Sequence, residues 1–129
     1  MIKALAVTFA LLLVSTTADA GPRHRASFDL GELLPHPAGC PRIAFCGCGV
    51  SVKLWGQAKR EYFRAAAYFR FPKAHAARGM VAVRNHHVMY IEDVDANGNA
   101  TVYDPNGGGH RTWRRVRSLA GYSIRNPNG

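Results

Sequence analysis

The second half of the chain alternates between turns and short segments rich in β-branched or aromatic residues, and this pattern constrains the fold most. The segments span residues 80–84, 87–94, 99–104, 110–116 and 122–125. Asn97-Gly98 is a strong hairpin signal because both residue types tolerate positive φ, and residues 105–109 supply a second turn. Strands joined by short turns pair with their neighbours, so we expect an antiparallel meander.

Before these segments, apolar residues recur at a spacing close to that of a helix. They are Val50, Leu54, Ala58, Phe63, Ala66, Ala67 and Phe69. Gly56 divides the pattern into two predicted helices, of which the second begins near Gln57 and ends before Pro72. Helices followed by a meander predict an α+β fold, with N-terminal helices packed on a small antiparallel sheet.

The first twenty residues have the features of a cleavable signal peptide. Lys3 precedes an apolar run over 4–14, and the small residues that end at Ala20 match a cleavage site. The run is shorter than the ~20 residues that span a bilayer, although an uncleaved membrane anchor is the alternative. We therefore expect a secreted or periplasmic protein without stable membrane insertion, with an irregular arm over 21–39 and one domain over 40–129.

Basic residues outnumber acidic ones by seventeen to eight, which gives a formal net charge of +9. In an exported protein this excess favours an anionic partner, because cations raise the local concentration of acidic polymers. Cell-wall polymer, lipid head groups and nucleic acid all fit the charge, as does a basic surface without a charge-selected partner. We expect no nucleic acid, because the sequence has neither an aromatic and basic RNA-binding signature nor helix-turn-helix spacing.

Three cysteines, Cys40, Cys46 and Cys48, remain after the predicted cleavage, and an odd number leaves one thiol unpaired or joined to another chain. Cys46 stands directly before the first helical pattern. The positive end of a helix favours the reactive thiolate, and its free amides can stabilise an oxyanion. Gly47 leaves room for the close approach of a substrate backbone, so Cys46 is a candidate nucleophile.

A nucleophilic cysteine needs a base, and His86 and His87 begin a predicted strand. Because side chains alternate along a strand, only one of them can point toward Cys46, and periodicity does not choose between them. The following hairpin returns Asp104 or Asn106 to the neighbourhood of this histidine, where either can orient the ring. A zinc site from the cysteines and a histidine is the metal alternative, but the spacings C-x₅-C and C-x-C are poor for zinc.

The segments "CPRIAFCGCGVSVKLWG" and "GMVAVRNHHVMYIEDVDANGNATVYDPNGGG" resemble the CHAP family of cysteine, histidine-dependent amidohydrolases and peptidases, part of the NlpC-type papain-like group. The resemblance covers about residues 40–125. It implies Cys46 as nucleophile and His87 as base, with Asp104 and Asn106 orienting or assisting the histidine. It also implies a papain-like α+β fold and a reaction that needs no metal or other cofactor.

By this resemblance the chain is a bacterial peptidoglycan hydrolase, a cysteine amidase or endopeptidase that cleaves amide bonds through a thioester. Peptidoglycan or another anionic wall polymer is then the partner of an expected monomer. His110 and Trp113 are candidate substrate contacts, and the basic segment 111–117 is a candidate contact to the anionic wall. The alternative is a non-catalytic exported basic domain of the same fold that binds wall polymer or a protein.

The odd cysteine count bears directly on this choice. We expect a disulfide between Cys40 and Cys48, which leaves Cys46 free. The pairings of Cys46 with Cys40 or with Cys48 are the alternatives, and the second closes a very small, strained ring. Either alternative would block the nucleophile and contradict the enzyme hypothesis.

Overall fold

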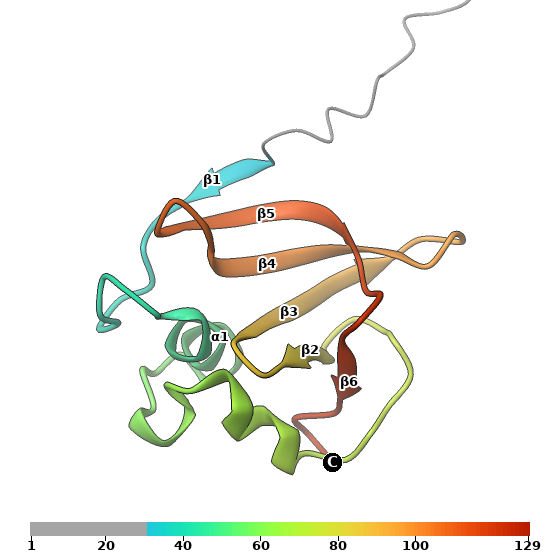
Figure 1. Ribbon diagram of the computed structural model, residues 1–129, viewed down its shortest axis with the longest axis horizontal. Coiled ribbons are helices and arrows are strands. Elements are labelled where there is room, and N and C mark those ends of the chain that lie inside the picture. Colours follow the sequence, from blue (N-terminus) through green and yellow to red (C-terminus); the bar gives the residue numbers. More distant parts are fainter. Residues whose placement is uncertain (1–30) are drawn as a thin grey trace, which may run out of the picture.

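One six-stranded antiparallel sheet dominates the computed structural model, which describes residues 31–129 (Figure 1). The strands are β1 (Glu32–Leu34), β2 (Val81–Arg84), β3 (His87–Val94), β4 (Asn99–Gly108), β5 (Arg111–Ser118) and β6 (Ser123–Arg125). Their order across the sheet is β1-β5-β4-β3-β2-β6. The predicted signal peptide lies outside the described residues, and β1 falls inside the segment expected to be an irregular arm.

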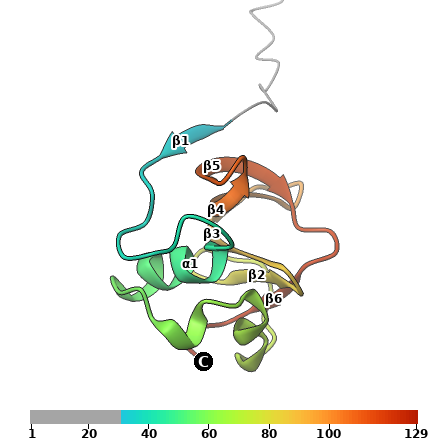
Figure 2. The same cartoon turned by 60° about the vertical axis from the view of Figure 1, so that its left-hand side comes forward.

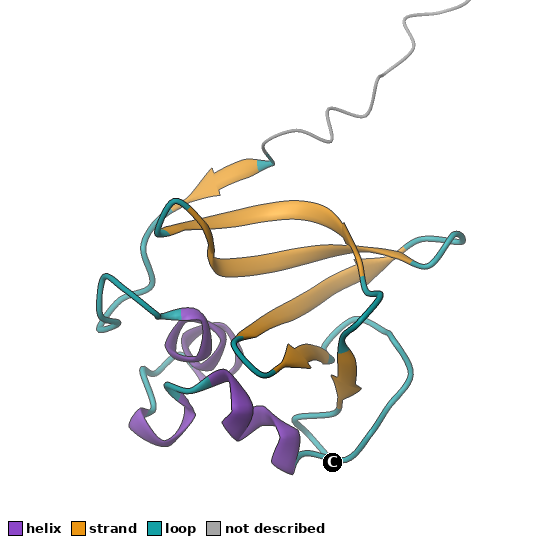
Figure 3. Ribbon diagram, viewed as in Figure 1, coloured by secondary structure: helices purple, strands orange, loops and turns teal. Residues whose placement is uncertain are grey.

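The prediction of an α+β fold, with N-terminal helices packed on a small antiparallel sheet, is wrong, because the fold is mainly β (Figure 3). Helical structure in the described part of the chain comprises α1 (Cys46–Trp55) and two short 3₁₀ segments, η1 (Arg60–Tyr62) and η2 (Ala65–Arg70). The second predicted helix therefore does not form. No helix within residues 31–129 is long and apolar enough to cross a membrane.

Aromatic packing explains why the second helix is absent. The rings of Tyr62 and Tyr68 both lie near the indole of Trp55, at centroid distances of 4.7 and 6.4 Å. Residues six positions apart on a regular α-helix point about 120° away from each other. Both tyrosines can pack on Trp55 only if the chain breaks between them, and it does so at Arg64, whose backbone is extended.

Alternating side chains of the sheet form two cores, one on each face. On the helical side, Val50 of α1 and Tyr68 of η2 pack against the first core, and α1 lies beside β3 and β4 (Figure 2). Its buried sheet residues are Val81, Val83 and Val88. The second core contains Ala82, Met89, Ile91, Ala100 and Val102. The sheet is therefore buried on both faces near its centre, which leaves the strand ends to form a site.

Candidate active site

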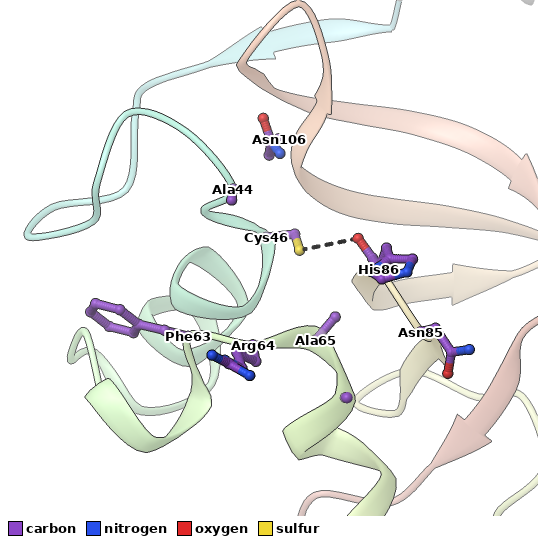
Figure 4. Close-up of a pocket in the computed structure, with 9 residues that line it drawn as sticks. Ala44, Cys46, Phe63, Arg64, Ala65, Asn85, His86 and Asn106 are labelled. Carbon is purple, nitrogen blue, oxygen red and sulfur yellow. Dashed lines mark hydrogen bonds between the residues drawn. The ribbon is translucent and has the colours of Figure 1, made fainter.

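The structure brings Cys46 and His87 together at one end of the sheet. Cys46 is the first residue of α1, His87 is the first residue of β3, and the Cys46 thiol is among the groups that raise the pKa of His87. Both residues are buried, with 5% and 8% of their surface exposed. The Sγ atom of Cys46 also lies 3.9 Å from the carbonyl oxygen of His86 (Figure 4). Of the two adjacent histidines, His87 is therefore the one whose ring meets the thiol.

Asp104 orients the imidazole of His87. The Nε2 atom of His87 donates a hydrogen bond of 2.5 Å to Oδ1 of Asp104, which leaves Nδ1 as the ring nitrogen available to Cys46. Burial lowers the pKa of His87, but the hydrogen bonds to Asp104 and Cys46 outweigh it and raise the pKa to about 9. The imidazole therefore carries its proton at neutral pH.

Two arginines of β5 hold Asp104, whose carboxylate is fully buried. Oδ2 of Asp104 accepts hydrogen bonds from Nε and Nη2 of Arg115, at 2.9 and 2.7 Å, and from Nη1 of Arg117 at 3.1 Å. Burial raises the pKa of Asp104, but the hydrogen bonds from His87 and Arg115 outweigh it and lower the pKa. The carboxylate is therefore ionised wherever the protein is folded near neutral pH.

Asn106, the other predicted partner of the histidine, makes no hydrogen bond to it in this structure. It lies where the register of β4 against β5 shifts, between Asp104 and Gly108, and its φ is 55°. Figure 4 shows the side chains of Asn106 and Ala65 on opposite sides of Cys46, and all three residues line one cleft. Asp104 thus makes the orienting contact, and Asn106 lines the space beside the thiol.

Two clefts meet beside Cys46 and His87. The Cys46 cleft has a volume of about 500 Å³ and is lined by Ala44, Cys46, Phe63, Arg64, Ala65, Ala66, Asn85, His86 and Asn106 (Figure 4). The His87 cleft has a volume of about 350 Å³ and is lined by Arg84, His86, His87, Asn106, Gly107, Gly108 and Arg117. His86 and Asn106 line both clefts, so the two clefts are neighbours, one bordered by the thiol and the other by the imidazole.

A disulfide joins Cys40 to Cys48, and Cys46 is a free thiol. The disulfide ties the loop before α1 to the first turn of the helix. Within that loop Ala44 has a φ of 47°, a strained conformation for a residue with a side chain, and such strain is often found at functional sites. Two of the three cysteines considered for the alternative zinc site are therefore joined in a disulfide.

Glycine allows β4 to approach the helix that carries Cys46. A Cβ atom at Gly49 would overlap with the ring of Pro105, the residue that follows Asp104. Gly47 is crowded in the same way, because the backbone oxygens of Tyr62 and Phe63 fill the space of its missing side chain. The room predicted for a substrate at Gly47 is thus occupied by the protein's own chain.

The other two predicted substrate contacts line neither cleft. His110 lies in the turn between β4 and β5, with a φ of 54°, and borders a separate hollow of about 310 Å³ together with Leu33 and Arg111. The indole Nε1 of Trp113 donates a hydrogen bond to the carbonyl oxygen of Gly108 at 3.1 Å. Trp113 therefore supports the turn of the β4–β5 hairpin.

Sequence reasoning missed the arginines that hold Asp104. The sequence predicts the basic segment 111–117 as a candidate contact to an anionic wall, and the structure shows that Arg114, Arg115 and Arg117 within it form salt bridges inside the protein. The available signal was the alternation of residues 113, 115 and 117. Once Asp104 pairs with Trp113 in the ladder, these side chains share its face of the sheet.

Comparison with known proteins adds no family to this geometry: no protein-family model matches the chain, and no curated protein matches its sequence. The resemblance to the CHAP family therefore stays a prediction that rests on the two sequence segments given above.

Proposed function

We propose that this protein is a cysteine hydrolase that cleaves amide bonds. The main support is the arrangement of Cys46, His87 and Asp104, in which Asp104 holds the imidazole by a hydrogen bond and the Cys46 thiol lines a cleft. A nucleophile, a base and a group that orients the base, all in contact, are what nucleophilic catalysis by cysteine requires.

In the first step, the Cys46 thiolate attacks the carbonyl carbon of the amide and a carbon–sulfur bond forms. Negative charge develops on the carbonyl oxygen, and the free backbone N–H groups at the start of α1 are donors suited to that oxygen. The imidazolium of His87 gives its proton to the amine nitrogen as the carbon–nitrogen bond breaks. The products of this step are a free amine and a thioester on Cys46.

In the second step, neutral His87 takes a proton from a water molecule that attacks the thioester carbon. The carbon–sulfur bond breaks, a carboxylic acid leaves, and the pair of thiolate and imidazolium is restored. Asp104 holds the ring in one orientation and stabilises its positive charge in both steps. It is a positioning residue, because it contacts the histidine and not the substrate.

We propose the peptide part of peptidoglycan as the substrate. Three sequence features support this choice: the predicted signal peptide, the net charge of +9 and the resemblance to CHAP amidases and peptidases. Peptidoglycan peptides are anionic and contain the amide bonds that this chemistry cleaves.

Digestion of purified peptidoglycan tests the proposal through the release of new amino groups. We expect Cys46→Ala and His87→Ala to lower the release at least about 1,000-fold. His75→Ala is the matched control, because His75 is exposed and lines neither cleft. Equal release by the wild type and Cys46→Ala would reject the proposal, and binding to peptidoglycan without any release would favour the non-catalytic alternative.

A further inference from the structure

Arg64 differs from the arginines of β5 in having no carboxylate partner among the described residues. Arg114, Arg115 and Arg117 all form salt bridges, and Arg64 forms none. Arg64 lines the Cys46 cleft together with Phe63 and Ala65, on the segment that runs past the start of α1 (Figure 4). None of the described residues that line this cleft is Asp or Glu. A residue that lines the Cys46 cleft thus carries a positive charge without a salt-bridge partner among the described residues.

The segment that carries Arg64 is fixed to the turn that carries Cys46. On one side of Arg64, the backbone of Tyr62 and Phe63 packs into the space left by Gly47. On the other side, the hydroxyl of Tyr68 donates a hydrogen bond of 2.7 Å to the carbonyl oxygen of Gly47. Two anchors on the residue next to Cys46 therefore fix the backbone of Arg64 relative to the nucleophile.

The second cleft has the same sign of charge. Arg84 and Arg117 line the His87 cleft, where the described lining residues include no Asp or Glu. The guanidinium of Arg84 lies over the ring of Tyr122, 4.8 Å from its centroid. Arg117 is paired with Asp104, so the charge available to an anionic ligand comes from Arg64 in one cleft and from Arg84 in the other.

We propose that Arg64 is a specificity-determining residue that binds a carboxylate of the substrate, so that the preferred substrate is an acidic peptide with a carboxylate close to the cleaved amide. This inference rests on the proposed hydrolase function. A guanidinium pairs with a carboxylate through two parallel hydrogen bonds, which fixes position as well as charge. Binding of the carboxylate at Arg64 would hold the neighbouring amide in the Cys46 cleft.

The test compares one peptidoglycan stem peptide in two forms, with its carboxylates free and with them converted to amides. For the wild type we expect kcat/KM to be about 10-fold higher for the free acid, mainly through a lower KM. Arg64→Gln should remove most of this preference, and Arg64→Lys should restore part of it. Arg60→Gln is the matched control, because Arg60 is exposed, lies in η1 and lines neither cleft.

Equal kcat/KM values of the wild type for the two peptides would overturn the inference, as would an equal loss for both peptides in Arg64→Gln. If neither peptide is cleaved, the hydrolase proposal fails, and binding of both peptides to the Cys46→Ala protein then decides the role of Arg64 by itself. Tighter binding of the free acid that is lost in Arg64→Gln, Cys46→Ala supports the inference. Equal binding of the two forms overturns it.

Discussion

The two sides of the candidate active site are held in different ways. On the cysteine side, a disulfide between Cys40 and Cys48 fixes the loop before α1 to the first turn of the helix. On the histidine side, ionic hydrogen bonds connect His87 to buried Asp104 and to the arginines of β5. The cysteine side should therefore respond to reductant, and the histidine side should respond to pH and to the loss of a charge.

The largest effect on stability should come from removing the buried carboxylate on the histidine side. We expect Asp104→Ala to lower the free energy of unfolding by about 4 kcal/mol, because two arginines and a histidine would lose a buried partner. Urea denaturation measures this loss. Asp93→Ala is the control, since Asp93 is exposed and forms no salt bridge within residues 31–129. A loss below about 1 kcal/mol would mean that the cluster is not needed for folding.

Removing the disulfide on the cysteine side should cause a smaller loss of stability. Replacing both Cys40 and Cys48 by alanine should lower the free energy of unfolding by about 2.5 kcal/mol, the value expected for a loop as short as this one. The same measurement on the wild type with and without reductant provides the check. Equal stability under the two conditions would show that the disulfide does not support the helix start.

The pH dependence separates the two sides without unfolding the protein. Activity should fall as the pH rises through about 9, because His87 then loses the proton that it gives to the leaving amine. The raised pKa also means that the contribution of His87 to stability is complete below its ordinary pKa of 6.5 and is lost as the pH rises through about 9. Rates measured between pH 6 and 10 test the first effect, and urea midpoints over the same range test the second.

The pH at which activity falls should also distinguish a variant of the histidine side from a variant of the cysteine side. Asp104→Asn weakens the bond that raises the pKa of His87, so its activity should fall at a lower pH than that of the wild type. The double variant of Cys40 and Cys48 should keep the wild-type limit, because neither residue contacts the imidazole. If this pH shifted in the disulfide variant and not in Asp104→Asn, the result would contradict the division into a cysteine side and a histidine side.

The smallest effect should come from an ion pair that belongs to neither side. The Nζ atom of Lys53 lies 3.2 Å from Oε1 of Glu92, and it lies over the rings of Tyr90 and Tyr103. We expect Lys53→Met to lower the free energy of unfolding by about 0.5 kcal/mol, because the lysine is partly exposed and methionine keeps most of its apolar contacts. A thermal melt compared with that of the wild type measures it, and an effect as large as that of Asp104→Ala would undermine the comparison.

The sequence predicted the strands, and the residues that lie near His87, better than it predicted the helices. Alternation and the hairpin at Asn97-Gly98 are local signals, and together they placed His87 near Asp104 and Asn106. The choice between Asp104 and Asn106 depended on the register shift in β4, which alternation does not reveal.

The helical region needed information that no local pattern carries. The break at Arg64 follows from the packing of Tyr62 and Tyr68 on Trp55, and the crowding at Gly47 follows from the same fold-back. From the sequence, an arginine such as Arg115 is predicted to be exposed to solvent. Its buried partner Asp104 comes near only when β4 pairs with β5. Tertiary contacts therefore determined the fold class, the crowding at Gly47 and the contact between Asp104 and the arginines of β5.

The two outer strands of the sheet determine how much unpaired backbone the sheet presents at its edges. β1 and β6 contain three residues each, whereas β5, which β1 covers, contains eight. Short edge strands offer few unpaired backbone groups to a neighbouring molecule. A chain shortened to start after Leu34 would uncover the edge of β5 at residues 112–114, close to Val116, which is already 58% exposed. Such a chain would be expected to aggregate edge to edge even though its thiol, histidine and carboxylate were all intact.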